Sequence, residues 1–288
     1  MQALIDLRRR VKSVKNTQQI TQAMKTVATA KFKKAQRTVL ESRPQWHQSS
    51  DFLTEVNFWA KRRDHPLLVE REENKIEGVV ITSDKGLCGA FNSNLLAEAQ
   101  SFFEEKARHA EVRLILMGKK SVAFFKRLPF PVDKAYSDKV QKLTLEDLRE
   151  LAQFLMRLYV FNKADAVYVA YNEFKSILFP RITISRLLPL GLPEGEDIEK
   201  TLPPDWEPGE SPIINSLLPF YVERQIYHFF FESIAAEHAA RMMAMDNATK
   251  NAGDLISDLT LVLNKIRQAS ITKELLEIMT AVEALTKK

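Results

Sequence analysis

Residues 220–288, FYVERQIYHFFFESIAAEHAARMMAMDNATKNAGDLISDLTLVLNKIRQASITKELLEIMTAVEALTKK, form a stretch with almost no helix breaker. The stretch contains no proline and a single glycine, Gly253. Glycine and proline disfavour a helix interior more than any other residue, so we expect one continuous helix. At 1.5 Å per residue this helix would be on the order of 100 Å long, several times the width of a domain. The sequence therefore predicts a helix that cannot be packed inside a globule.

The N-terminal end is equally poor in breakers. Residues 1–43 contain neither glycine nor proline, whereas all 12 prolines and seven of the eight glycines lie in the middle of the chain. Apolar residues at both ends alternate spacings of three and four, which is typical of a coiled-coil seam. We expect the two helices to pair antiparallel, because the middle of the chain must leave and return between them. The predicted seam residues are Leu4, Leu7, Val11 and Val14 in the first helix and Ala248, Ala252, Leu255, Leu259, Val262 and Ile266 in the last.

A polar stretch interrupts the first seam at residues 16–19 (NTQQ), and Ile20, Met24 and Val27 resume it. Polar residues in a seam lower the stability of a helix pair. Two interpretations stay open. The stretch is a polar layer that fixes the register of the pair, or this part of the helix is supported by surrounding molecules.

The middle of the chain has the pattern of an α/β domain. Short aliphatic runs predict strands at residues 78–82, 112–117, 166–171 and 181–188, and helical periodicity predicts helices at 93–107, 119–127 and 144–161. This order implies a largely parallel sheet covered on both faces. The predicted fold class is α/β, with a Rossmann-like domain and a long antiparallel coiled coil of the two terminal helices.

This pattern divides the chain into four parts. The proline-rich acidic segments PEGEDIEK and PPDWEPGESP indicate an exposed loop before the last helix. We expect an N-terminal coiled-coil helix over residues 1–60, an α/β domain over 76–190, this loop over 191–219 and a C-terminal coiled-coil helix over 220–288.

The composition excludes several classes of protein. The 288 residues are 45% hydrophobic and 27% charged, with a net charge of +5, of which residues 1–43 alone contribute +9. The longest apolar runs are a few residues, far short of the ~20 that a membrane-spanning helix needs. The N-terminus lacks the apolar segment of a secretory signal. The single cysteine, Cys88, excludes an internal disulfide and favours a reducing, cytoplasmic compartment.

Signals for catalysis or cofactor binding are weak. Gly86 and Gly89 do not match the G-x-G-x-x-G spacing, and GKKS at residues 118–121 lacks the leading glycine of a phosphate-binding loop. The five histidines do not form an H-E-x-x-H motif, and no G-x-S-x-G motif is present. We expect no catalytic residue, cofactor or metal site, and we expect Cys88 to be a buried, inert thiol.

The basic first helix leaves alternative functions open. Its lysines and arginines could bind nucleic-acid phosphates, although Phe32 is the one aromatic residue among residues 1–43 and no DNA-binding motif accompanies it. The same charge could bind an acidic protein surface. One alternative is therefore a basic coiled-coil protein that associates with nucleic acid or acts as a scaffold. A doubly wound enzyme with helical arms is another.

Four segments carry a family resemblance. They are residues 13–36 (SVKNTQQITQAMKTVATAKFKKAQ), 83–92 (SDKGLCGAFN), 232–252 (ESIAAEHAARMMAMDNATKNA) and 267–278 (RQASITKELLEI). In this order the segments resemble the gamma subunits of bacterial ATP synthases. The chain departs from the family pattern at Gln19, at Thr26 and in the region before Pro219.

The resemblance implies a rotor. The paired helices would form an asymmetric shaft inside the hexameric head of alpha and beta subunits. The α/β domain would lie beside the epsilon subunit and on the membrane ring of c subunits. The chain would be a non-catalytic, peripheral protein on the cytoplasmic face of the bacterial plasma membrane, with no nucleic acid bound and no direct membrane insertion. Ion-driven rotation would change the nucleotide affinity of each catalytic subunit in turn.

The resemblance also implies site residues. Five side chains would contact the catalytic subunits: Met24, Arg241, Gln268, Thr272 and Glu274. Arg241 suits this role because a guanidinium can bind a carboxylate through two hydrogen bonds. Core packing is an equally good interpretation of Met24. The paired-cysteine redox control of photosynthetic members is excluded, because Cys88 has no second cysteine.

The last turns carry an apolar stripe at helical spacing, which consists of Ile271, Leu275, Ile278, Val282 and Leu285. An antiparallel helix that starts at Met1 would end before this stripe. We therefore expect the stripe to act as an apolar bearing against a surrounding collar, with continuation of the coiled coil as the alternative.

Overall fold

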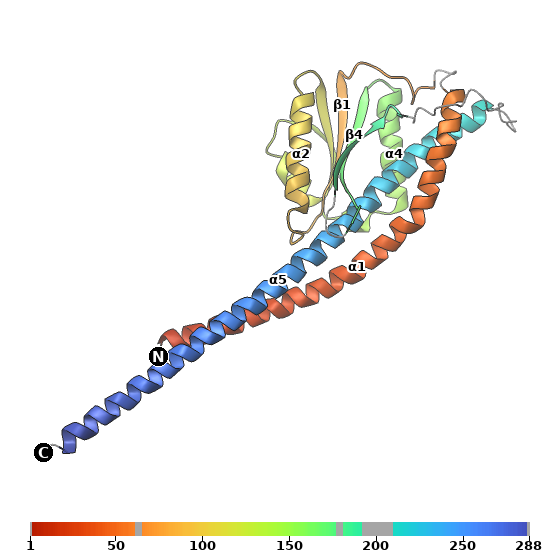
Figure 1. The fold of residues 1–288 in the computed structure, drawn as a ribbon. Coiled ribbons are helices and arrows are strands. Elements are labelled where there is room, and N and C mark those ends of the chain that lie inside the picture. The colour runs from red at the N-terminus through yellow and green to blue at the C-terminus, as the bar shows by residue number, and fades with distance from the viewer. Residues whose placement is uncertain (1, 61–64, 177–180, 192–209, 287–288) are drawn as a thin grey trace. The chain divides into compact units, whose positions relative to one another are not determined.

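The computed structural model describes residues 2–60, 65–176, 181–191 and 210–286, and the side chains of residues 4–41, 65–176, 181–191 and 212–282. The chain forms two compact units, residues 28–241 and residues 1–27 together with 242–288. Two long helices, α1 (Gln2–Ala60) and α5 (Glu210–Thr286), each contribute to both units (Figure 1). The predicted pair of long terminal helices is confirmed.

A five-stranded sheet with the strand order β3-β2-β1-β4-β5 forms the centre of the larger unit. The first four strands run parallel to their neighbours, and β5 pairs antiparallel with β4 at one edge. The predicted, largely parallel sheet is therefore confirmed. The strands are β1 (Lys75–Ile81), β2 (Glu111–Met117), β3 (Val132–Tyr136), β4 (Ala166–Glu173) and β5 (Arg181–Leu188).

The sequence pattern did not predict β3. Its sequence, VDKAY, lacks an aliphatic run, and its residues are only half-buried or exposed. An edge strand pairs on one side only, so its side chains need not be apolar. Pairing with β2 forms this strand, and local propensity does not reveal it.

Both faces of the sheet are covered, as predicted. Helices α2 (Phe91–Lys106) and α3 (Lys119–Phe125) pack on one face, and α4 (Leu145–Val160) and the first half of α5 pack on the other. Gly78 in β1 permits a close approach of α2, because a Cβ at this position would lie 2.4 Å from the ring of Phe103. At the start of α4, the Thr144 hydroxyl accepts a hydrogen bond from the Asp147 amide, and the Asp147 carboxylate accepts one from the Thr144 amide.

Helix α5 begins at Glu210, so residues 210–219 are helical where we expected the end of the loop. The expected boundary rested on Pro219, which lies inside the helix. A proline removes one helical hydrogen bond. Ile214, Leu218 and Val222 repeat every four residues and are fully buried in the same core as α4, which offsets that loss. The remainder of the predicted loop, residues 192–209, lies outside the described residues.

In the smaller unit, α1 and α5 pair antiparallel. Lys25 Nζ lies 2.6 Å from Asp246 Oδ1, and Thr249 Oγ1 lies 2.8 Å from Thr21 Oγ1. Thr21 is almost fully buried. Thr21 and Thr249 therefore form a polar layer inside the seam. Of the interrupted stretch itself, Gln18 is half-buried, whereas Asn16, Thr17 and Gln19 are exposed, so both interpretations of residues 16–19 stay open.

The phase of the predicted seam was wrong at several positions. Leu255 and Val262 are exposed, and their neighbours Ile256 and Leu263 are half-buried in their place. In α1, Ile20 and Val27 are exposed, and the seam continues through the polar residues Gln18 and Thr21 instead. Apolar residues stand both at the positions we predicted and at the positions that face the partner helix, so their spacing alone could not show which set forms the seam. The seam is instead Leu4, Leu7, Val11, Val14, Gln18 and Thr21 in α1 against Met245, Thr249, Ala252, Ile256, Leu259, Leu263 and Ile266 in α5.

Candidate partner-contact site

The larger unit has the topology in which many α/β proteins bind a ligand. The connection from β1 to β2 contains α2 on one face of the sheet, and the connection from β3 to β4 contains α4 on the other. The carboxyl ends of β1 and β4 are therefore the point where the connections diverge, which is the usual ligand crevice of a doubly wound sheet.

Side chains of α5 fill this position. The Ser233 hydroxyl donates to the carbonyl of Ile81 at the end of β1, at 3.5 Å. The Glu232 carboxylate accepts a hydrogen bond from the amide of Phe174, just after β4, at 2.9 Å. Both α5 side chains are almost fully buried. Helix α5, which runs beside β4 in Figure 1, thus occupies the place where other sheets hold a small molecule.

Arg241, one helical turn further along than Glu237, continues this contact. Its Nη1 donates to Glu237 Oε1 at 2.7 Å. Its Nη2 donates to the carbonyls of Lys85 and Gly86 at 3.1 and 3.3 Å, and its Nε donates to Gly86 at 3.4 Å. Arg241 and Glu237 are 8% and 1% exposed. The guanidinium is therefore engaged on all sides by groups of the same chain.

Next to the buried pair of Glu237 and Arg241 lies His238, which adds no second positive charge at neutral pH. Burial raises the pKa of Glu237, and the guanidinium of Arg241 opposes that rise. Burial, and then the positive charges of Arg241 and Lys31, lower the pKa of His238 to about 4. His238 is therefore neutral at pH 7 and does not repel Arg241, whose Nη1 lies 3.5 Å from its Nδ1.

The turn that Arg241 holds, residues 84–89, is supported from the other side by a buried polar cluster. Asn92 Nδ2 donates to Ser83 Oγ at 2.8 Å and to Cys88 Sγ at 3.1 Å. Cys88 is 2% exposed, and burial raises the pKa of its thiol. The predicted buried cysteine is confirmed, and a neutral thiol is a poor nucleophile.

The tip of this turn faces solvent. Lys85 is exposed, and Leu87 is exposed with a φ of 62°, a left-handed conformation that a branched side chain adopts at a cost. The Asp84 carboxylate accepts hydrogen bonds from the amides of Lys119, Asp138 and Val140, each at 3.0 Å. The surroundings therefore fix the backbone of the turn.

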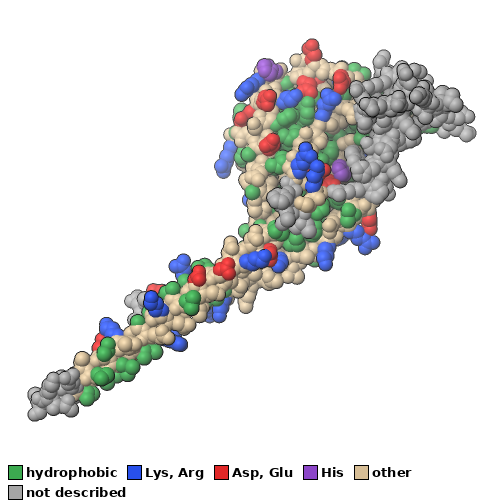
Figure 2. All heavy atoms as spheres, viewed as in Figure 1, with side chains coloured by type: hydrophobic (Ala, Val, Ile, Leu, Met, Phe, Trp, Pro, Cys, Tyr) green, Lys and Arg blue, Asp and Glu red, His purple; other side chains and the backbone are tan. Residues whose placement is uncertain are grey.

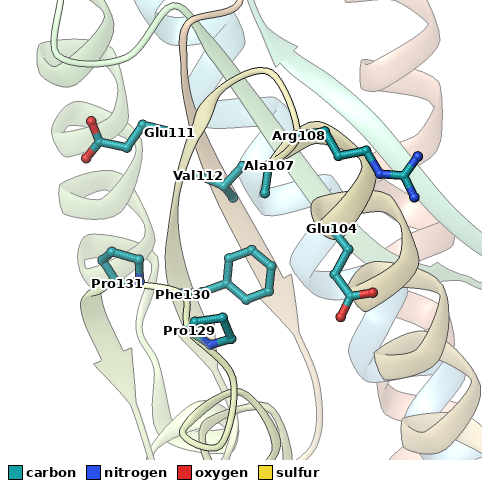
Figure 3. Close-up of a pocket in the computed structure, with 8 residues that line it drawn as sticks. All are labelled: Glu104, Ala107, Arg108, Glu111, Val112, Pro129, Phe130 and Pro131. Atoms are coloured by element: carbon teal, nitrogen blue, oxygen red, sulfur yellow. The ribbon is translucent and has the colours of Figure 1, made fainter.

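Figure 3 shows a pocket of about 360 Å³ at another edge of this unit. Its floor is apolar, and its charged side chains point outward at the rim. No serine, cysteine or histidine lines it, and its two glutamates lie at the rim. The lining residues are Glu104, Ala107, Arg108, Glu111, Val112, Pro129, Phe130 and Pro131.

The part of the chain that the structure describes contains neither a cluster of metal-ligating side chains nor a membrane-spanning helix. Its histidines, cysteine and acidic residues do not gather in any group of three or more that could hold a metal ion. None of its helices combines the length and apolarity required to cross a membrane.

The predicted partner-contact residues divide between the two units. Arg241 belongs to the larger unit and is buried, whereas Met24, Gln268, Thr272 and Glu274 belong to the smaller unit. Met24 is half-buried, and the other three are exposed. The pattern did not single out Glu237 or Gln141. The four-residue spacing from Glu237 to Arg241 is the one sequence signal that could have found this pair.

The predicted apolar stripe lies where the helix pair ends. The cross-helix contacts join residues whose numbers sum to 270 or 271, so Gln2, where α1 begins, lies opposite residue 268 or 269. Every side chain from Ile271 to Val282 is exposed. Ile271, Leu275, Ile278 and Val282 are between 49% and 60% exposed. Figure 2 shows hydrophobic side chains along this end of α5. The side chain of Leu285 lies outside the described residues.

A family model described as ATP synthase matches residues 3–285 of the chain. The ATP synthase gamma chain of Pelotomaculum thermopropionicum is 43% identical over 285 residues, which cover 99% of this chain and 100% of that relative. The gamma chain of Desulforudis audaxviator is 41% identical over 297 residues, with coverage of 99% and 100%.

Two solved structures share the fold. A chain in the Euglena gracilis mitochondrial ATP synthase (OSCP, F1 and c-ring, rotational state 3) is 19% identical, with a TM-score of 0.67 and coverage of 98% of this chain and 94% of that one. A chain in the central stalk and c-ring of the Tetrahymena thermophila mitochondrial ATP synthase is 24% identical, with a TM-score of 0.60 and coverage of 80% and 99%.

Proposed function

The chain belongs to the family of ATP synthase gamma chains, and we propose that it is the central rotor shaft of a membrane ATP synthase. The observation that carries this function is the match over nearly the whole chain, in which α1 and α5 are the shaft and the α/β domain is its base. The chain supplies no group for phosphoryl transfer. Its role is to turn and to change the conformation of the subunits that do the chemistry.

The mechanism is a population shift driven by asymmetry. Two helices of unequal length form a shaft that presents different side chains at different angles. Each of three identical catalytic subunits therefore contacts a different surface, and the angle selects which subunit is open, loosely closed or tightly closed. Rotation by the ion-driven ring moves each subunit through these states and changes its nucleotide affinity. Hydrolysis drives the same coupling in reverse.

The partners follow from this role. The alpha and beta subunits would surround the shaft, and the epsilon subunit and c-subunit ring would contact the α/β domain. The protein would be peripheral, on the cytoplasmic face of a bacterial plasma membrane. The excess of positive charge in residues 1–43 suits contact with acidic loops of the head, which needs no further motif.

Two groups of residues would mediate contact with the head. Gln268, Thr272 and Glu274 are exposed and free to reach a catalytic subunit, and half-buried Met24 would contribute the edge of its side chain. The stripe that starts at Ile271 would be the apolar bearing, because nondirectional contacts resist rotation less than hydrogen bonds do. Arg241 can contact a catalytic subunit only if assembly breaks the hydrogen bonds that it makes within its own chain.

The first experiment is assembly. The chain mixed with the alpha and beta subunits of a relative should copurify with them at high salt and support ATP hydrolysis with observable rotation. If the chain instead bound nucleic acid, and this binding weakened by about 10³-fold or more between 50 and 200 mM salt, the result would favour the nucleic-acid alternative.

The contact residues need a separate test. The double variant Gln268→Ala, Thr272→Ala should lower ATP synthesis by the assembled enzyme about tenfold, the effect of losing roughly 1.4 kcal/mol of contact energy. The free chain should keep its stability, because both side chains are exposed. Asp258→Ala, an exposed change on the same helix, is the matched control. Unchanged synthesis would remove both residues from the contact.

A further inference from the structure

The rotor role, on which this inference rests, requires torque to pass from the α/β domain into α5. The contacts between the two differ in kind. The apolar core between the sheet and α5 is nondirectional, and such contacts allow one surface to slide over another. Hydrogen bonds have fixed directions and resist sliding. The directional contacts between them are therefore the ones that can resist rotation of α5 about its own axis.

A chain of hydrogen bonds, exposed at Lys31 and Gln141 and buried at Glu237 and Arg241, joins three elements of the larger unit. On α1, Lys31 Nζ donates to Gln141 Oε1 at 3.0 Å. Gln141, in the short helix η1 (Val140–Lys142), donates through Nε2 to Glu237 Oε1 on α5 at 3.0 Å. Glu237 accepts from Arg241, and Arg241 donates to the carbonyls of Lys85 and Gly86.

We propose that Lys31, Gln141, Glu237, Arg241 and the turn of residues 84–89 form an internal torque joint, in which Arg241 is a positioning residue that locks the α/β domain onto α5. Arg241 acts inside the chain, through the backbone of the turn. This role differs from the direct partner contact that the family resemblance implies for the same residue.

The hydrogen bonds of Arg241 fix the turn to α5 in more than one direction, which a single charge pair would not do. Its planar fork reaches two consecutive carbonyls on one side and a carboxylate on the other. A lysine at this position would be a single point charge and could not hold all three acceptors in fixed directions. The pair is buried, so water does not compete for these bonds.

The turn is itself rigid, which a lock requires. Asp84 ties it to the amides of Lys119, Asp138 and Val140, at the carboxyl ends of β2 and β3. A force applied anywhere on the sheet therefore reaches the two carbonyls that Arg241 holds. If the turn were flexible, the hydrogen bonds of Arg241 would move with it and would transmit no torque to α5.

The test uses the assembled ATP synthase that contains the full chain. The variants are Arg241→Ala, which removes the lock, and Arg241→Lys and Glu237→Gln, which weaken it with less disturbance. Arg224→Ala is the matched control, because Arg224 lies exposed on the same helix of the same unit. A bead is attached to the α/β domain through Lys126→Cys, an exposed site, while the buried Cys88 stays unmodified.

Three results are expected for Arg241→Ala. Amide hydrogen exchange in residues 84–90 should accelerate about tenfold with no change in α4. The angular spread of the bead during each catalytic pause should increase. ATP synthesis against a load should fall about threefold while unloaded hydrolysis stays within about twofold, a split that a loss of folded protein would not produce. Arg241→Lys should give intermediate values.

Several outcomes would overturn the joint. Unchanged exchange in residues 84–90 together with lost synthesis would mean that Arg241 acts on a partner. An angular spread equal to that of Arg224→Ala would mean that the other contacts of α5 with the α/β domain, the apolar packing and the hydrogen bonds of Glu232 and Ser233, carry the torque. If Arg241→Ala fails to assemble, Arg241→Lys and Glu237→Gln decide by the same measurements. A wild-type complex that does not rotate would overturn the rotor function, while the exchange data would still report on the lock.

Discussion

Glu77 is a carboxyl group buried in the apolar core. It lies on β1, on the face that α4 covers, and is 2% exposed. Among the described residues, its Oε1 is a buried side-chain oxygen that lacks a hydrogen-bond partner. Burial, and then the negative charge of Asp133, raise its pKa to about 8, while the positive charge of Arg113 opposes that rise.

This shift makes the stability of the chain depend on pH. The carboxyl group loses its proton near pH 4.5 in the unfolded chain and near pH 8 in the folded one. Between these values the unfolded state is charged and hydrated while the folded state keeps the proton, so stability falls as the pH rises. At pH 7 the loss is on the order of 3 kcal/mol.

Glu77→Gln should therefore raise the thermal midpoint of the full chain at pH 7 to 8, with an advantage that disappears near pH 4.5. The glutamine keeps the size of the side chain and does not titrate. Glu150→Gln, at an exposed position of α4, is the control. Thermal unfolding from pH 4.5 to 8 measures both. Parallel curves for the wild type and Glu77→Gln would contradict this account.

Single residues were the hardest to predict from the sequence. The sequence indicated that Cys88 would be buried, because a lone cysteine without a base partner behaves as a small apolar residue. The surroundings of Arg241 could not be predicted in the same way. Its acceptors, the carbonyls of Lys85 and Gly86, are more than 150 residues away, and backbone carbonyls have no sequence signature.

At the scale of elements, most helices and strands followed from local pattern. Aliphatic runs predicted four of the five strands, and the absence of breakers predicted both long helices. The sequence did not predict the elements that form only through contact with another part of the chain. Strand β3 forms against β2, and the beginning of α5 forms against the core despite Pro219. The phase of the coiled-coil seam also depends on the partner helix.

The polar layer of Thr21 and Thr249 explains that phase. Each hydroxyl also lies within hydrogen-bond distance of a backbone carbonyl of its own helix, and the bond between the two hydroxyls forms only when the two residues face each other, so it favours one register. The ion pair of Lys25 with Asp246 lies beside it and favours the same register. Apolar residues on both sides of each helix would otherwise permit a shifted pairing.

The double variant Thr21→Val, Thr249→Val should raise the free energy of unfolding of the full chain by about 1 kcal/mol, because it buries methyl groups in place of hydroxyls. Each single variant should be neutral or destabilising, since one hydroxyl then loses its partner across the seam. Urea unfolding of the four proteins measures the coupling as a double-mutant cycle. Additive changes would show that the two hydroxyls do not act as a layer.

At the scale of the whole chain, the helix pair is unequal. Helix α1 begins at Gln2, opposite residue 268 or 269 of α5, and α5 continues to Thr286. In the described part of this end, the apolar stripe from Ile271 to Val282 is exposed. The sequence predicted this inequality from the lengths of the two breaker-free ends. It could not identify what covers the stripe, because that surface belongs to another molecule.

Truncation after Leu276 should therefore affect the complex and not the free chain. Residues 277–282, which the truncation removes, are exposed, so the thermal midpoint of the isolated chain should stay the same. The assembled head should unfold at a lower temperature, because it loses apolar contact area at the bearing. Calorimetry of both samples tests this. An equal midpoint for the assembled complexes would mean that the stripe is not a bearing.

The contact of Glu232, Ser233 and Arg241 with the carboxyl ends of β1 and β4 has a consequence for pharmacology. A dinucleotide analogue designed to bind this class of sheet would have to displace α5. Because α5 belongs to the same chain, its effective concentration at this position is high. Compounds selected to stop this machine would therefore find better targets in the surfaces that the chain offers to its neighbours.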